Sequence, residues 1–169
     1  MFDEIGGLPV HPLVVHVAVV LVPLAGLLGV LFAIPPTRRW ARVPLAIVAV
    51  GAALTVLVTR RSGQNLAAVL GIDEGADDPL STLIQEHAER ANLLSLLTIA
   101  FAVLAVAAWL STRSPERLSA AVPVVLSVLL VLGAGALVFQ TYRVGDIGSR
   151  AVWNPTGEQS YQIDGDGAE

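Results

Sequence analysis

The chain contains no cysteine and no lysine, and it has few charged or aromatic residues. Without cysteine it can form no disulfide, zinc–thiolate site or iron–sulfur cluster. Charged residues make up 14% of the chain, whereas soluble domains are about 25% charged. No long arginine-rich stretch interleaves with aromatic residues, so we expect no nucleic-acid partner. These absences indicate that lipid, rather than water, surrounds most of the chain.

Hydrophobic residues make up 54% of the 169 residues, and they are concentrated in four uncharged runs. The runs cover residues 12–34, 43–59, 91–112 and 118–142. A membrane-spanning helix needs about 20 apolar residues, and within lipid a spanning segment must satisfy its own backbone hydrogen bonds. We therefore predict an all-α integral membrane four-helix bundle, with four transmembrane helices in a lipid bilayer.

The predicted domain covers residues 1–153. Its four helices are expected at about 12–34, 43–66, 82–111 and 118–143. The remaining segment, 154–169, is polar and acidic. It cannot bury enough apolar surface to fold alone, so we predict a disordered tail.

We find no internal repeat. Small residues such as Gly26, Gly29, Gly133 and Gly135 are expected to let the helices approach closely.

The charges between the apolar runs predict an orientation. Arginines occupy the first and third connectors (Arg38, Arg39 and Arg42, then Arg113 and Arg117). Acidic residues occupy the second (Asp73, Glu74, Asp77 and Asp78), and the other five arginines lie at the helix ends that face the same side (Arg60, Arg61, Arg90, Arg143 and Arg150). Because basic connectors remain in the cytoplasm, both termini and the second connector are predicted to be extracytoplasmic.

Ionisable residues gather at the helix ends that this orientation places outside. They include His11, His16, Arg60, Arg61, Glu86, His87, Arg90 and Asp146. Helical bundles hold haem and metals through side chains that project inward from facing helices. A cofactor-binding set is therefore predicted to comprise His16 and His87 as ligands, with Arg60 and Arg61 binding haem propionates. A metal site would use His11, His16, His87 and Asp146.

The two N-terminal histidines are five residues apart, which separates them by roughly 140° on a regular helix. Pro12 suits the first helical position, and His11 would then lie just outside the helix, free to fold back toward the side that His16 faces. His16 lies about one turn inside the apolar run, where an ionisable residue requires a partner. We name His87 or Asp146 as that partner.

Simpler interpretations remain open for each of these residues. His11 could be an interfacial polar residue, and His16 a neutral imidazole bonded to a neighbouring helix. The Arg60–Arg61 pair could anchor the helix end at lipid headgroups. Glu86 and Arg90 have the spacing of a solvated helix ion pair.

Four segments, taken in order, resemble a bacterial membrane family known as domain of unknown function 2231. They are HPLVVH (11–16), TRRSGQNL (59–66), EHAERAN (86–92) and RVGDIGSRAVW (143–153). The resemblance extends from about Leu8 to Trp153 and implies a multi-pass protein of the bacterial plasma membrane. Family members typically carry His-Pro-x-x-x-His-Phe-Pro, Ser-Gly-Glu, His-Ala-Glu and Gly-His-Ser-Gly-Ala before a final Trp.

The chain departs from these family motifs at several positions. Val17-Ala18 replaces Phe-Pro, Gln64 replaces the Glu of Ser-Gly-Glu, and Asp146 and Ile147 replace His-Ser. A carboxylate at 146 disfavours haem ligation there but is compatible with a His/carboxylate metal site, because zinc accepts both ligand types. The resemblance supports the expected fold and the expected site residues, but it implies no activity.

The leading hypothesis is a membrane protein whose histidine cluster binds b-type haem, or a divalent metal such as Zn or Cu, in a redox role. The alternative is a non-catalytic accessory subunit of a larger membrane complex, or a homo-oligomer. A transporter or proton relay ranks below both, since no span carries a charge at mid-depth. Hydrolytic chemistry is disfavoured because neither a Ser/His/Asp set with distinctive spacing nor a phosphate-binding glycine loop is present.

Overall fold

The computed structural model describes residues 4–72, 76, 78–113, 119 and 121–161, and within them the chain forms four long helices. These are α1 (Val10–Ala33), α2 (Pro35–Val69), α3 (Pro79–Ser111) and α4 (Ala121–Trp153). All four are long and apolar enough to cross a membrane. The predicted all-α architecture of four apolar helices is therefore confirmed.

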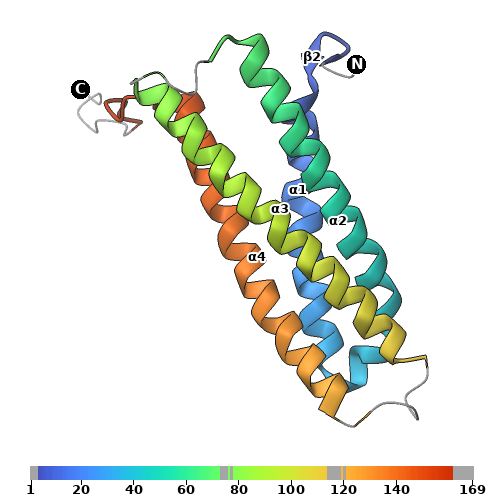
Figure 1. The fold of residues 1–169 in the computed structure, drawn as a ribbon. Coiled ribbons are helices and arrows are strands. Elements are labelled where there is room, and N and C mark those ends of the chain that lie inside the picture. The colour runs from blue at the N-terminus through green and yellow to red at the C-terminus, as the bar shows by residue number, and fades with distance from the viewer. Residues whose placement is uncertain (1–3, 73–75, 77, 114–118, 120, 162–169) are drawn as a thin grey trace, which may run out of the picture.

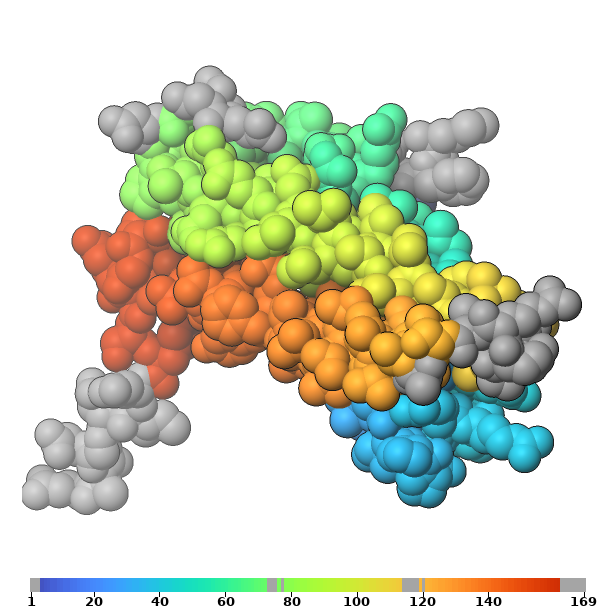
Figure 2. Space-filling model, turned by 60° about the horizontal axis from the view of Figure 1, so that its bottom comes forward, coloured from blue at the N-terminus to red at the C-terminus, as the bar shows by residue number. Residues whose placement is uncertain are grey.

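The helices form a four-sided bundle in which each packs mainly against two neighbours. α1 packs against α2 and α4, and α3 packs against the same two, so α1 and α3 lie diagonally opposite. The side-by-side packing of α3 and α4 can be followed along their length in Figures 1 and 2. Both chain ends lie at the end of the bundle where α1 and α3 begin (Figure 1). We call this the histidine end, after His11 and His87. We call the other the arginine end, after Arg38, Arg39, Arg42 and Arg113.

A short hairpin that the sequence analysis did not anticipate precedes α1. Strands β1 (Glu4–Ile5) and β2 (Leu8–Pro9) pair antiparallel. The connecting Gly6 and Gly7 have φ angles of 60° and 79°. Two-residue hairpin turns of this kind need positive φ at both positions, which glycine adopts without strain. The hairpin leads directly into Val10, so α1 begins before Pro12 and includes His11.

The first connector is shorter than predicted, and its arginines are helical. α2 begins at Pro35, because consecutive prolines suit the first positions of a helix. Arg38, Arg39 and Arg42, predicted in the connector, therefore lie in the first turns of α2. Arg38 donates from Nε to the Phe32 carbonyl (3.1 Å) and from Nη2 to the Ala33 carbonyl (3.3 Å). Its side chain thus satisfies carbonyls at the end of α1.

At the histidine end the helices continue beyond the apolar runs. α2 has 35 residues, and α3 and α4 have 33 each. At 1.5 Å per residue they are about 50 Å long, whereas the bilayer core is about 30 Å thick. Several polar turns therefore project past the apolar part of the bundle.

The described part of the predicted tail folds back on the end of α4. Asn154 Oδ1 accepts a hydrogen bond from the Gln159 amide (3.0 Å), and the Tyr161 hydroxyl donates to the Trp153 carbonyl (2.5 Å). The rest of the tail, 162–169, lies outside the described residues.

The core depends on small residues that leave room for an aromatic ring. Phe101 of α3 is 2% exposed. A Cβ atom added at either Gly29 or Gly133 would come within 2.8 Å of its ring. Gly26 lies against Ala134, whereas Gly135 has no neighbour within 4 Å of a built Cβ. Three of the four glycines expected at close approaches therefore occupy them.

Candidate functional site: a pair of histidines on opposite helices

His11 is held at the start of α1 by the end of α2. Its Nδ1–H donates to the Thr59 carbonyl at 2.9 Å, and the same nitrogen lies 3.3 Å from Ser62 Oγ. The imidazole covers Gly63, where an added Cβ would lie 2.9 Å from the ring carbon Cε1. Only glycine leaves the ring in this position without a shift. The end of α2 thus supplies both a hydrogen-bond acceptor and a surface without a side chain.

His87 is held in the same way in the second helical hairpin. Its Nδ1–H donates to the Val144 carbonyl of α4 at 3.1 Å. An added Cβ at Gly148 would again lie 2.9 Å from Cε1. In each hairpin the accepting carbonyl belongs to the residue four positions before the glycine. The α1–α2 and α3–α4 hairpins therefore repeat one local arrangement that the sequence did not reveal.

The two imidazoles meet between the diagonal helices. Their ring centroids are 6.5 Å apart, and their planes are nearly perpendicular, at 87°. A carbonyl oxygen can only accept, so the proton of each neutral ring is on Nδ1. Each Nε2 then carries a lone pair and is free to accept a proton or bind a metal. Both side chains are half-buried.

The other predicted site residues do not join this pair. His16 is exposed, and its Nδ1–H donates to the Pro12 carbonyl in its own helix at 2.6 Å. Asp146 forms an ion pair with Arg150 at 3.2 Å. Arg60 and Arg61 are both exposed. Within the described part of the chain, no group of three or more His, Asp or Glu side chains could hold a metal ion.

Two cavities lined by described residues open at the histidine end. The smaller, about 160 Å³, is lined by His11 together with Glu4 and Pro9 of the N-terminal hairpin and Ser62 and Asn65 of α2. It connects one imidazole with the surface.

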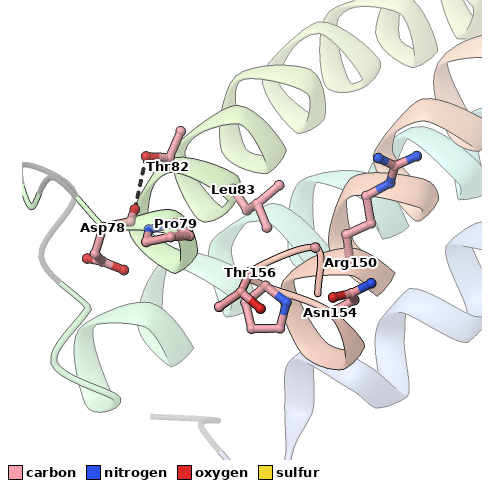
Figure 3. Close-up of a pocket in the computed structure, with 9 residues that line it drawn as sticks. Asp78, Pro79, Thr82, Leu83, Arg150, Asn154 and Thr156 are labelled. Carbon is pink, nitrogen blue, oxygen red and sulfur yellow. Dashed lines mark hydrogen bonds between the residues drawn. The ribbon is translucent and has the colours of Figure 1, made fainter. Parts of the chain in front are cut away.

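The larger cavity lies apart from the histidines, between the start of α3 and the end of α4 (Figure 3). Its volume is about 680 Å³, and its walls include Asp78, Thr82, Arg150, Asn154 and Thr156. None of the histidines lines it.

Gly63 and Gly148 match glycines of the family motifs, but the sequence analysis assigned a role in the site neither to them nor to the two carbonyls that hold the imidazoles. Gly63 and Gly148 both lie in the polar segments that end α2 and α4, each next to a serine. The sequence pattern that could have indicated them is a glycine in the polar end of one helix together with a histidine near the start of the preceding helix. The carbonyls of Thr59 and Val144 could not be recognised from the sequence, because every residue has a backbone carbonyl.

The chain matches a protein family over most of its length. The sequence profile of a family described as "Predicted membrane protein (DUF2231)" matches residues 7–158. No curated protein and no solved structure matches the chain.

Proposed function

We propose that this chain, which belongs to the family "Predicted membrane protein (DUF2231)", binds a transition-metal ion between His11 and His87. The observation that carries this proposal is the shared hydrogen bonding of the two rings. Histidines that bind metals almost always donate their other ring N–H to a carbonyl, carboxylate or water, which fixes the ring and leaves the second nitrogen as ligand. Both imidazoles here donate to backbone carbonyls.

The separation of the rings suits a single ion. Metal–nitrogen bonds of about 2.0–2.1 Å put the ring centres roughly 6.4 Å apart when the two nitrogens lie on opposite sides of the ion, as in square-planar Cu(II), whereas the tetrahedral angle of Zn would bring the centres to roughly 5 Å. The observed centroid distance is 6.5 Å. Imidazole suits Zn and Cu among other metals, and water or an exogenous ligand would complete the coordination. Copper would permit the redox role expected from the sequence, whereas zinc has no redox chemistry.

An ion is favoured over haem by the space beside the ligands. The cavity next to His11 holds about 160 Å³, whereas pockets for drug-sized ligands and cofactors measure about 300–1,000 Å³. A hydrated ion could reach His11 through this cavity. Haem binding would require the helices to separate at the histidine end, and Arg60 and Arg61 would then be candidates for its propionates.

We further propose that the histidine end is extracytoplasmic, in a bacterial plasma membrane. Support comes from the arginine end, where Arg38, Arg39 and Arg42 lie in the first turns of α2 and Arg113 follows α3, with no acidic residue among them in the described part of the chain. The arginines at the histidine end instead share it with Glu86, Glu89 and Asp146. Basic residues of this kind are retained on the cytoplasmic side. The histidine pair would then meet metal ions from outside the cytoplasm.

The test is to load the purified protein with Zn²⁺ or Cu²⁺ in mild detergent, remove excess metal, and measure bound metal and the visible spectrum. We expect His11→Ala and His87→Ala each to abolish stoichiometric binding, because one imidazole alone is a weak site. His16→Ala is the matched control and should bind as the wild type does, since its ring lies outside the pair.

The proposal is wrong if both variants of the pair retain metal. Equal loss in His16→Ala would instead favour the ligand set expected from the sequence. A Soret band in the protein as purified would identify haem. A protein without affinity for metal or haem would favour the non-catalytic accessory subunit.

A further inference from the structure

Two arginines share one carboxylate between α3 and α4, near the histidine end. Glu86 Oε1 lies 3.8 Å from Arg90 Nη2 and 3.8 Å from Arg143 Nη2. Both distances exceed the 2.7–2.9 Å of a charge-assisted hydrogen bond. The Asp146–Arg150 pair on α4 differs, because Arg150 Nε donates to Asp146 Oδ1 at 3.2 Å and the charges balance one to one. Glu86, Arg90 and Arg143, which we call the arginine cluster, carry a net charge of +1.

One donor of this cluster is buried without a partner. Arg143 Nε is inaccessible to solvent and has no hydrogen-bond partner among the described residues. Neighbouring Gln140 is also buried, but its Nε2 donates to the Arg90 carbonyl at 2.9 Å. An unsatisfied buried donor costs about 1–3 kcal/mol, and more when it is charged. The arginine cluster therefore lacks both an acceptor and a negative charge.

The cluster is accessible to a ligand from the surface. The exposed fractions of its side chains are 36% for Arg90, 39% for Arg143 and 43% for Glu86. It lies where the apolar runs of α3 and α4 give way to their polar ends, the depth at which lipid headgroups meet a membrane protein. Excess positive charge at a surface attracts anionic groups on either side of a membrane.

We propose that the arginine cluster binds a phosphate group, supplied by an anionic lipid headgroup or by free phosphate. The planar fork of a guanidinium matches the oxygens of a phosphate, which can accept two bonds from one arginine. A singly charged phosphate would bring the cluster to neutrality and offer acceptors to Arg90 and Arg143. This site is separate from the histidine pair and does not depend on metal binding.

The experiment uses the full chain, delipidated in an uncharged detergent. Native mass spectrometry would measure binding of phosphatidylglycerol and of diacylglycerol, which has the same acyl chains but no phosphate. Thermal stability would be followed in inorganic phosphate. We expect phosphatidylglycerol to bind and diacylglycerol not to bind. Arg143→Gln should weaken binding about tenfold through the lost charge-assisted bonds.

Two further variants distinguish a phosphate site from general damage. Glu86→Gln should strengthen phosphate binding severalfold, because it removes the competing carboxylate, and misfolding cannot produce a gain. Arg150→Gln, on the same helix but already paired with Asp146, should bind as the wild type does.

Stabilisation by inorganic phosphate without lipid binding would support the site and identify free phosphate as its source. The proposal fails if neither phosphate compound binds, if diacylglycerol binds equally well, or if Glu86→Gln weakens binding.

Discussion

At the scale of single residues, each histidine of the pair depends on the absence of a side chain opposite it. The rings occupy the space that a Cβ would fill at Gly63 and Gly148. The atoms that an added Cβ would meet belong to the imidazoles themselves, so a side chain at either position would displace the ring. The position of the imidazoles is therefore determined by the partner helices as much as by the histidines themselves.

We predict that Gly63→Ala and Gly148→Ala each displace one imidazole and lower metal affinity by roughly 10–100-fold, the usual effect of disturbing residues that support a ligand. Gly51→Ala in α2 and Gly145→Ala in α4 are matched controls, because a Cβ there has no neighbour within 4 Å. Metal titrations of all four variants provide the measurement. Equal affinities in the four would contradict the supporting role of Gly63 and Gly148.

The sequence identified His11 and His87 among the candidates but could not choose between His11 and His16. Both histidines proved to be helical, so the angular separation that their spacing predicts applies to them, and His11 faces α2 while His16 is exposed. The choice depended on where α1 begins. The Gly6–Gly7 hairpin leads directly into the first residue of α1. The periodicity of apolar residues does not indicate where the helix begins.

At the scale of elements, the sequence predicted the number and order of the helices because long apolar runs have one solution in lipid. It placed their polar ends less well. α4 continues to Trp153 through a segment in which Asp146 and Arg150 pair one helical turn apart. The segment contains Gly145 and Gly148, which are poor helix formers, so the ion pair and the burial of Ile147 and Ala151 support the helix after its apolar run has ended.

The start of α3 depends on one carboxylate. Asp78 Oδ1 accepts from the amides of Leu80 (3.0 Å) and Ser81 (3.1 Å). Hydrogen bonds from Ser81, and then from Leu80, lower the pKa of Asp78 below its ordinary value of 3.8. Because the folded-state pKa is the lower one, the cap contributes its full stability above pH 3.8 and loses it as the pH falls through the folded-state value.

We therefore predict that Asp78→Ala lowers the melting temperature at neutral pH by on the order of a few degrees. Asp78→Asn should retain most of the stability, since Asn also caps helices. Because Asn does not titrate, its melting temperature should fall less between pH 7 and pH 3 than that of the wild type. Thermal unfolding in detergent from pH 7 to pH 3 measures both effects. An acid dependence in Asp78→Asn identical to that of the wild type would show that this cap does not titrate as described.

At the scale of the whole molecule, the chain consists of two helical hairpins. Each contributes to a common site one imidazole that is held against a backbone carbonyl and a glycine. Neither hairpin could form the pair alone, because His11 and His87 belong to diagonal helices. The repetition lies in the contacts and not in the residue types around them, which explains why sequence inspection found no repeat. A site of this kind requires both hairpins to have the same orientation in the membrane.

The absence of cysteine allows a direct test of that orientation. Single cysteines can be introduced at Ser160, which follows α4 at the histidine end, and at Ser119, which precedes α4 at the arginine end; both positions are exposed. With a membrane-impermeant maleimide on intact bacterial cells or spheroplasts, we expect Ser160→Cys to react at once and Ser119→Cys to react only after permeabilisation. The reverse pattern would place the histidine pair in the cytoplasm, where it would meet a tightly buffered metal pool. Labelling at both positions in sealed cells would indicate mixed insertion, and it would remove the charge argument on which the orientation depends.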